Sequence, residues 1–151
     1  LAMAQLSQGG NAPLFDRLSL RALSALGSQS AESRLIDTEA SIYRELQAIT
    51  LSRSRLDIET FIKTPRLTVL DWGIPDLSGL SAERAEDREL CARVIVRAIE
   101  AFEPRLSKPT VQLAAYRQGR DICRFSLAAE LRLGVIRERL IFNLGVEADD
   151  A

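Results

Sequence analysis

The spacing of hydrophobic residues predicts helices in the first two thirds of the chain. From about residue 33 to 50 the apolar residues recur at intervals of seven, four and three, which places them on one face of a helix. These residues are Leu35, Ile42, Leu46 and Ile49. An apolar stretch over 14–26 precedes this helix, and a short helical piece is expected near 66–71, between turns.

A second amphipathic helix is expected between Ser81 and Phe102. Ser81 can accept hydrogen bonds from the first-turn N–H groups, and Pro104 disfavours helical geometry at Glu103. The intervening apolar residues form one stripe, which predicts a face packed against a core. They are Leu90, Cys91, Val94, Ile95, Ala98, Ile99 and Phe102.

After Pro109 the apolar residues recur at every second position, which is typical of strands that bury one face. Three strands are expected, over 111–115, 123–133 and 140–146, separated by turns that contain glycine. Consecutive strands joined by short turns form an antiparallel meander. The sequence therefore predicts an α+β fold in which N-terminal helices pack on a C-terminal three-stranded antiparallel β-meander.

The length of 151 residues predicts a single domain. Small polar residues and glycines dominate the start, so we expect a flexible leader over 1–13, one domain over 14–147 and a tail over 148–151. Neither a 20-residue apolar run nor a signal peptide is evident, which favours a cytoplasmic protein without direct membrane insertion.

Charge and composition narrow the possible chemistry. The chain has 20 basic and 21 acidic residues, so its net charge of -1 makes nucleic acid an unlikely partner class. It has no histidine, which excludes catalysis by imidazole and zinc sites with histidine ligands. Its two cysteines, Cys91 and Cys123, are far apart in apolar stripes, which predicts buried thiols. No metal or cofactor is expected.

Three carboxylates lie beside turns or prolines, namely Asp71, Asp76 and Glu103. One hypothesis is a muramidase that uses Glu103 with Asp71 or Asp76, since glycoside hydrolysis needs two carboxyl groups. The other is a structural role, because carboxylates at turns commonly accept backbone hydrogen bonds. The pattern favours the structural role.

Glu103, Pro104 and Arg105 form the most distinctive short segment. An acid and a guanidinium separated by a rigid proline can hold a fixed hydrogen-bonding geometry toward a partner. The alternative is a local exposed ion pair of little energy. Trp72, the only tryptophan, either seals a core or anchors an interface.

A three-stranded sheet also has two edges, and an uncovered edge permits strand addition from a partner.

Several segments, in this order, resemble the TssE family. TssE is the baseplate subunit of the type VI secretion system, related to the lysozyme-like wedge protein of contractile phage tails. The segments that carry the resemblance are Leu14-Phe15-Asp16-Arg17-Leu18, Ser41-Ile42-Tyr43-Arg44-Glu45-Leu46, Val69-Leu70-Asp71-Trp72-Gly73-Ile74-Pro75-Asp76-Leu77-Ser78 and Ala98-Ile99-Glu100-Ala101-Phe102-Glu103-Pro104-Arg105-Leu106. The most specific parts of this resemblance are the Gly-x-Pro-Asp-Leu turn and the Glu-Pro-Arg tripeptide.

The resemblance implies a structural protein, not an enzyme, at the baseplate on the inner face of the cell envelope. It would dock in the wedge with TssF, TssG and TssK and initiate polymerisation of the sheath subunits. Glu103, Pro104 and Arg105 match the family motif and are implied as contact and core-organising residues. Trp72 and Asp76 are further protein-binding candidates.

A third hypothesis is a regulatory binding module that resembles the anti-adaptor proteins of the same superfamily.

Overall fold

A computed structural model describes residues 31–81, 83–113, 122–133 and 136–147. The chain divides after Tyr43 into two compact units, Leu1–Tyr43 and Arg44–Ala151. The apolar stretch over 14–26, the leader and the tail lie outside the described residues. A single domain over 14–147 stays a prediction.

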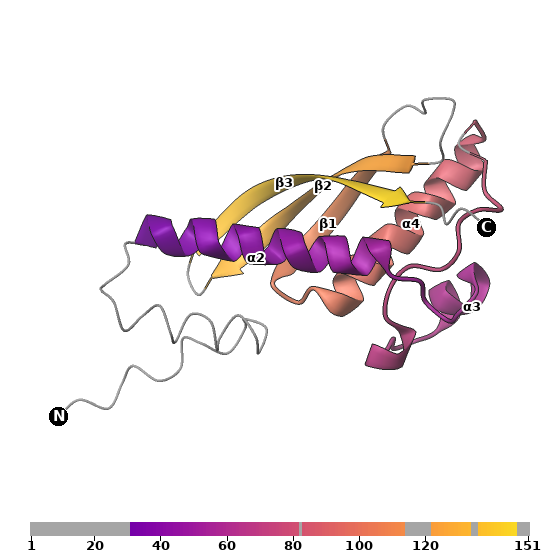
Figure 1. Cartoon of the computed structure of the whole chain (residues 1–151), viewed down its shortest axis with the longest axis horizontal. Coiled ribbons are helices and arrows are strands. Elements are labelled where there is room, and N and C mark those ends of the chain that lie inside the picture. The colour runs from indigo at the N-terminus through magenta and orange to yellow at the C-terminus, as the bar shows by residue number, and fades with distance from the viewer. Residues whose placement is uncertain (1–30, 82, 114–121, 134–135, 148–151) are drawn as a thin grey trace. The chain divides into compact units, whose positions relative to one another are not determined.

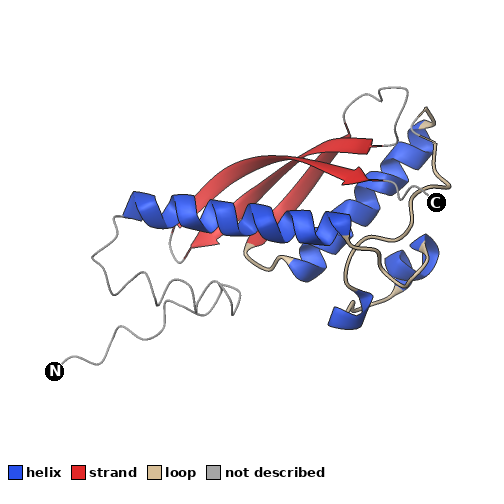
Figure 2. Ribbon diagram, in the orientation of Figure 1, coloured by secondary structure: helices blue, strands red, loops and turns tan. Residues whose placement is uncertain are grey.

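Helices come first in the described chain and strands last, as Figure 2 shows. The elements are α2 (Ala31–Leu51), α3 (Ile58–Lys63), the 3-10 helix η2 (Val69–Asp71), α4 (Ala85–Phe102), β1 (Leu106–Leu113), β2 (Ile122–Leu133) and β3 (Ile136–Glu147). The predicted α+β class, with a three-stranded antiparallel sheet in the C-terminal part, is confirmed.

The two long helices occur where the apolar periodicity predicts them, but α4 begins three residues later than an N-cap at Ser81 would place it. The hydroxyl of Ser81 accepts a hydrogen bond from the N–H of Glu83 at 3.3 Å, while its own N–H donates to Asp87 Oδ2 at 2.9 Å. These bonds make a turn ahead of the helix, so the N-cap position falls to Arg84. Ser81 is therefore not the cap of α4.

The sheet has the order β1-β2-β3, with both neighbouring pairs antiparallel. Alternate residues of β2 and β3 are buried and form its apolar face. They are Phe125, Leu127, Ala129, Leu131, Leu140, Phe142 and Leu144. Helix α4 contacts β1 (Figure 1), and its own buried residues are Val94, Ile95, Ala98 and Ile99. The core of the second unit therefore combines helix and sheet side chains.

Helix α3 was not predicted, and an arginine of α4 forms hydrogen bonds with carbonyl groups at its C-terminal end. Arg97 of α4 donates Nε–H to the carbonyl oxygen of Phe61 at 3.0 Å and Nη2–H to the carbonyl oxygen of Thr64. Carbonyl groups at a helix C-terminus lack partners within the helix, so a guanidinium satisfies them well. Phe61 is fully buried.

The loop after η2 approaches the chain after α2 so closely that only glycine fits at position 73. Ile74 N–H donates to the carbonyl oxygen of Ser52 at 2.9 Å, and Ser54 N–H donates to that of Ile74 at 3.0 Å. Gly73 has a φ of 97°, and a Cβ there would lie 2.4 Å from the carbonyl oxygen of Ser52. Both the dihedral angle and the contact exclude a side chain.

We expect Gly73→Ala to lower the free energy of unfolding by roughly 2 to 3 kcal/mol, because it adds backbone strain and a clash with backbone atoms. Urea denaturation of the full chain measures this loss. Gly79→Ala is the matched control, since a Cβ at Gly79 meets nothing within 4 Å. Equal stability of the two variants would contradict the close approach.

Candidate functional site

The Glu-Pro-Arg segment connects α4 to β1. The N–H of Glu103 donates to the carbonyl oxygen of Ile99 at 2.9 Å, which closes the last helical turn. Pro104 cannot donate a backbone hydrogen bond, so the helix ends here. The N–H of Leu106 then donates to the carbonyl oxygen of Glu103 at 3.2 Å, and Leu106 is the first residue of β1. The tripeptide therefore sets where helix becomes sheet.

The side chains of Glu103 and Arg105 form a two-point ion pair. Arg105 donates from Nε to Oε1 at 2.8 Å and from Nη2 to Oε2 at 2.6 Å, and its backbone N–H donates to Oε1 at 3.1 Å. Only 1% of the Glu103 side chain and 4% of the Arg105 side chain are exposed. Charges removed from water in this way need close partners, and each group supplies one to the other.

This geometry changes the interpretation of the pair. It is local, as one hypothesis had it, but it is buried, so the small energies of exposed ion pairs do not apply. Pro104 is the exposed member of the tripeptide. That Glu103 or Arg105 contacts a partner directly stays a prediction. In this conformation both side chains are buried, so their effect on a partner would be indirect, through the connection between α4 and β1 that they hold in place.

Removing one member of this pair is expected to destabilise the protein far more than removing both. Arg105→Ala leaves a buried carboxylate without its cation, which costs about 3 to 5 kcal/mol. The double variant Glu103→Met/Arg105→Met replaces both charges by apolar chains, and we expect stability within about 1.5 kcal/mol of the wild type.

Urea denaturation of both single methionine variants and of the double variant completes the thermodynamic cycle. An additive cycle would show that the pair is not coupled.

Asp71 organises the loop that carries η2. Its Oδ2 accepts hydrogen bonds from the N–H and the hydroxyl of Thr68, each at 2.9 Å, and its Oδ1 accepts from Arg55 Nε at 3.1 Å and Nη2 at 3.0 Å. Asp71 is only 4% exposed. Sequence reasoning did not single out Arg55 or Thr68, although Thr-x-x-Asp is a recognisable capping pattern.

The same contacts lower the pKa of Asp71 below its ordinary value. The backbone N–H of Thr68 is the largest cause, followed by the Thr68 hydroxyl and, with smaller effects, Arg55. A carboxyl group whose pKa is lower in the folded than in the unfolded state stabilises the fold at pH values above its unfolded-state pKa. That stabilisation is lost as the pH falls through the pKa of the folded state.

We therefore expect Asp71→Asn to be less stable than the wild type at pH 7, with the difference shrinking as the pH falls below about 4. Urea midpoints of both proteins at pH 7 and pH 3 measure it. Asp37→Asn is a suitable control because Asp37 is exposed. A stability difference between Asp71→Asn and wild type that does not change with pH would contradict the assignment.

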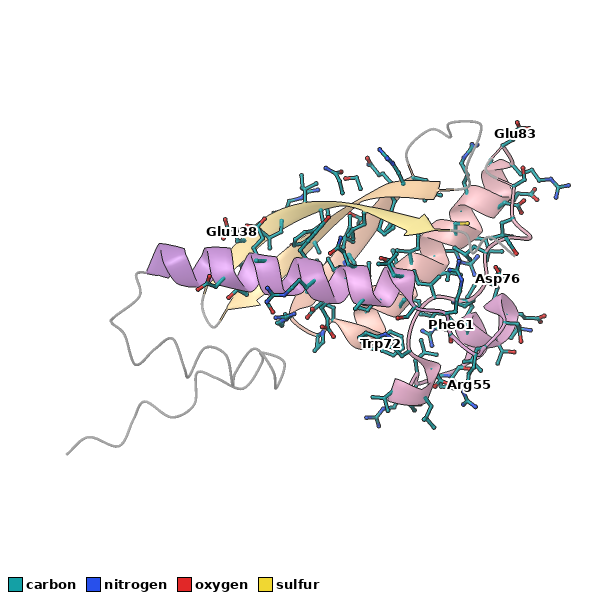
Figure 3. The ribbon with its side chains drawn as sticks, in the orientation of Figure 1. Arg55, Phe61, Trp72, Asp76, Glu83 and Glu138 are labelled. Atoms are coloured by element: carbon teal, nitrogen blue, oxygen red, sulfur yellow. The ribbon has the colours of Figure 1, made fainter. Side chains whose placement is uncertain are left out.

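The other two predicted binding residues lie on the same loop. Trp72 is half-buried and its ring contacts that of Phe102, with centroids 5.1 Å apart and planes inclined at 47°. Phe102 directly precedes Glu103, so the structure brings Trp72 to the end of α4. Asp76 is exposed and accepts hydrogen bonds from the N–H and hydroxyl of Ser78, both at 3.0 Å. Figure 3 shows Trp72 and Asp76.

The carboxylates do not have the properties of a glycosidase pair. A catalytic acid needs a raised pKa and access to substrate. Both oxygens of Glu103 bind Arg105 and are sealed from solvent. The pKa values of Asp71 and Asp76 are lowered, in each case chiefly by a backbone N–H, from Thr68 and Ser78 respectively. The geometry gives the muramidase hypothesis no support.

The two edges of the sheet differ. β1 contains a bulge between Ser107 and Thr110, where Lys108 has a φ of 52° and Pro109 lacks an N–H. Bulges, lysines and prolines are devices that oppose pairing at an edge. β3 pairs with β2 without a shift from Ile136 to Glu147, and no further strand pairs with it among the described residues. β3 is therefore the edge that better fits strand addition.

Neither a metal-binding cluster nor a membrane-crossing helix occurs in the part of the chain that the structure describes. No group of three or more acidic, histidine or cysteine residues is placed to hold a metal ion there. In that same part of the chain, no helix has the length and apolar character needed to cross a membrane. Cys91, expected to be buried, is half-buried on α4, and the side chain of Cys123 lies outside the described residues.

Comparison with known proteins gives two findings. A family model described as "Baseplate wedge protein gp25" matches residues 36–134. Among solved structures, a chain of "The baseplate complex from the type VI secretion system" is 15% identical, with 74% of this chain and 96% of that chain covered and a TM-score of 0.48. A comparison with curated proteins finds no match.

Proposed function

The chain belongs to the baseplate wedge protein gp25 family, and from this membership we propose that it is a TssE-type subunit of a type VI secretion baseplate. A structural baseplate role follows from the family itself. The narrower assignment is supported by the Gly73-Ile74-Pro75-Asp76-Leu77 turn and the Glu103-Pro104-Arg105 tripeptide, which occur in the order of that family. In this role the protein acts without catalysis, at the cytoplasmic face of the envelope.

The proposed activity is initiation of the contractile sheath by strand addition at β3. The observation that supports it most is the uninterrupted register of β3 with β2, from Ile136 to Glu147. A strand with an unshifted register offers its outer N–H and C=O groups at regular spacing, so an extended segment of a sheath subunit can pair along it. The proposed partners are TssF, TssG and TssK on the wedge side, and the sheath subunits at this edge.

The Glu103–Arg105 pair has an indirect part in this proposal. It fixes the passage from α4 to β1, and β1 pairs with β2, which in turn pairs with β3. The sheet is thus held at a defined position on the helix before a partner arrives. A prearranged edge reduces the conformational entropy that binding must overcome.

Lysines placed on β3 are expected to abolish initiation without unfolding the protein. Ile141 and Asn143 are both exposed, and Ile141→Lys/Asn143→Lys adds cations beside exposed Arg139. Charged residues on an edge strand oppose pairing, so we expect sheath assembly to fall about tenfold or more. Fluorescent sheath structures, counted in cells that carry the variant in place of the wild type, measure this.

The sheet supplies a matched control at its opposite edge. Thr110 and Gln112 of β1 are exposed and lie in the same cross-strand rows as Ile141 and Asn143, through Ala128 and Ser126 respectively. Thr110→Lys/Gln112→Lys therefore carries the same charges on the same face, and we expect it to assemble sheaths normally. Normal assembly by the β3 variant would remove this edge from the mechanism.

A further inference from the structure

Two adjacent aliphatic side chains on η2 are almost fully in solvent. Val69 is 83% exposed and Leu70 is 72% exposed. Single exposed aliphatic residues are common on protein surfaces, but here two neighbouring residues of one short turn are exposed together. We refer to Val69 and Leu70 as the η2 knob.

The η2 knob is rigidly built. The carboxylate of Asp71 joins Thr68 to Arg55, the N–H of Asp71 donates to the carbonyl oxygen of Thr68 at 2.9 Å, and Ser54 Oγ donates to that of Asp71 at 2.8 Å. The next residue, Trp72, packs on Phe102 of α4. An apolar element fixed on both sides loses little conformational freedom on binding, which is the property of an interface anchor.

The charges beside the η2 knob are cationic. In residues 64–72 the only acid is Asp71, which is buried, and the only base is Arg66, which is exposed. Arg55 pairs with Asp71, yet 65% of its side chain remains exposed, and Figure 3 shows it at the end of this unit away from the sheet. A complementary partner surface therefore presents carboxylates around an apolar pocket.

We propose that the η2 knob docks into an apolar pocket bordered by carboxylates on another subunit of the baseplate wedge. This proposal rests on the proposed baseplate function and adds a second contact to it. The β3 edge would serve the sheath, and the η2 knob would hold the protein in the wedge. The two surfaces lie on separate elements, so each can be altered alone.

The test measures binding of the full chain to the co-purified wedge subunits TssF, TssG and TssK from the same genome. We expect Val69→Ser/Leu70→Ser to bind about tenfold or more weakly than the wild type, with unchanged circular dichroism and thermal midpoint. Arg66→Glu is expected to weaken binding about threefold or more, since it repels the carboxylates. Leu51→Ser is the matched control, because Leu51 is an aliphatic residue of α2 that is 58% exposed, and it should bind as the wild type does.

Each other outcome identifies which proposal fails. Undiminished wedge binding by Val69→Ser/Leu70→Ser would overturn the η2 knob proposal while the baseplate function stands. Absence of wedge binding by the wild type itself would overturn the baseplate function and this docking proposal together. A wild-type dimer in analytical ultracentrifugation that the same double variant abolishes would overturn the proposal by assigning the η2 knob to a contact between copies.

Discussion

A buried carboxylate and guanidinium hold the second unit of this protein at the junction of its helix and its sheet. Glu103 ends α4 and Arg105 precedes β1, so their ion pair ties together two elements that differ in backbone geometry. Isolated, either charge would be costly at this depth, and together they are mutually satisfied. The ring of Trp72 packs on Phe102 at the same place and brings the preceding loop to this junction. The loop, the end of α4 and the start of β1 are thus held together at one junction.

Much of this fold can be predicted from the periodicity of apolar residues. Where those predictions are wrong, the cause is local. The long helices and the meander follow from intervals of 3.6 and 2 residues. Periodicity did not predict helix α3, because its six residues complete fewer than two turns and so show no repeat. β1 was expected to begin after Pro109, yet it begins at Leu106, because a bulge lets the strand continue past a residue that cannot donate.

The chemistry of the site was less predictable than its residue types. The spacing of Glu103 and Arg105 is the same for an exposed pair and for a buried one, and only packing decides between them. Arg55 and Asp71 are 16 positions apart, so no local pattern connects them. The difference between the two sheet edges depends on the left-handed backbone of Lys108, which a single sequence does not display.

That difference has a consequence for assembly. A sheet with one irregular edge and one regular edge is expected to accept an added strand on one side only, because only the regular edge presents evenly spaced N–H and C=O groups. Under the proposed strand addition, sheath growth would start at β3 alone and would therefore have a polarity. In that proposal, the bulge at Lys108 and Pro109 would leave β1 unsuited to a second added strand, so the subunit would stand at the end of the array.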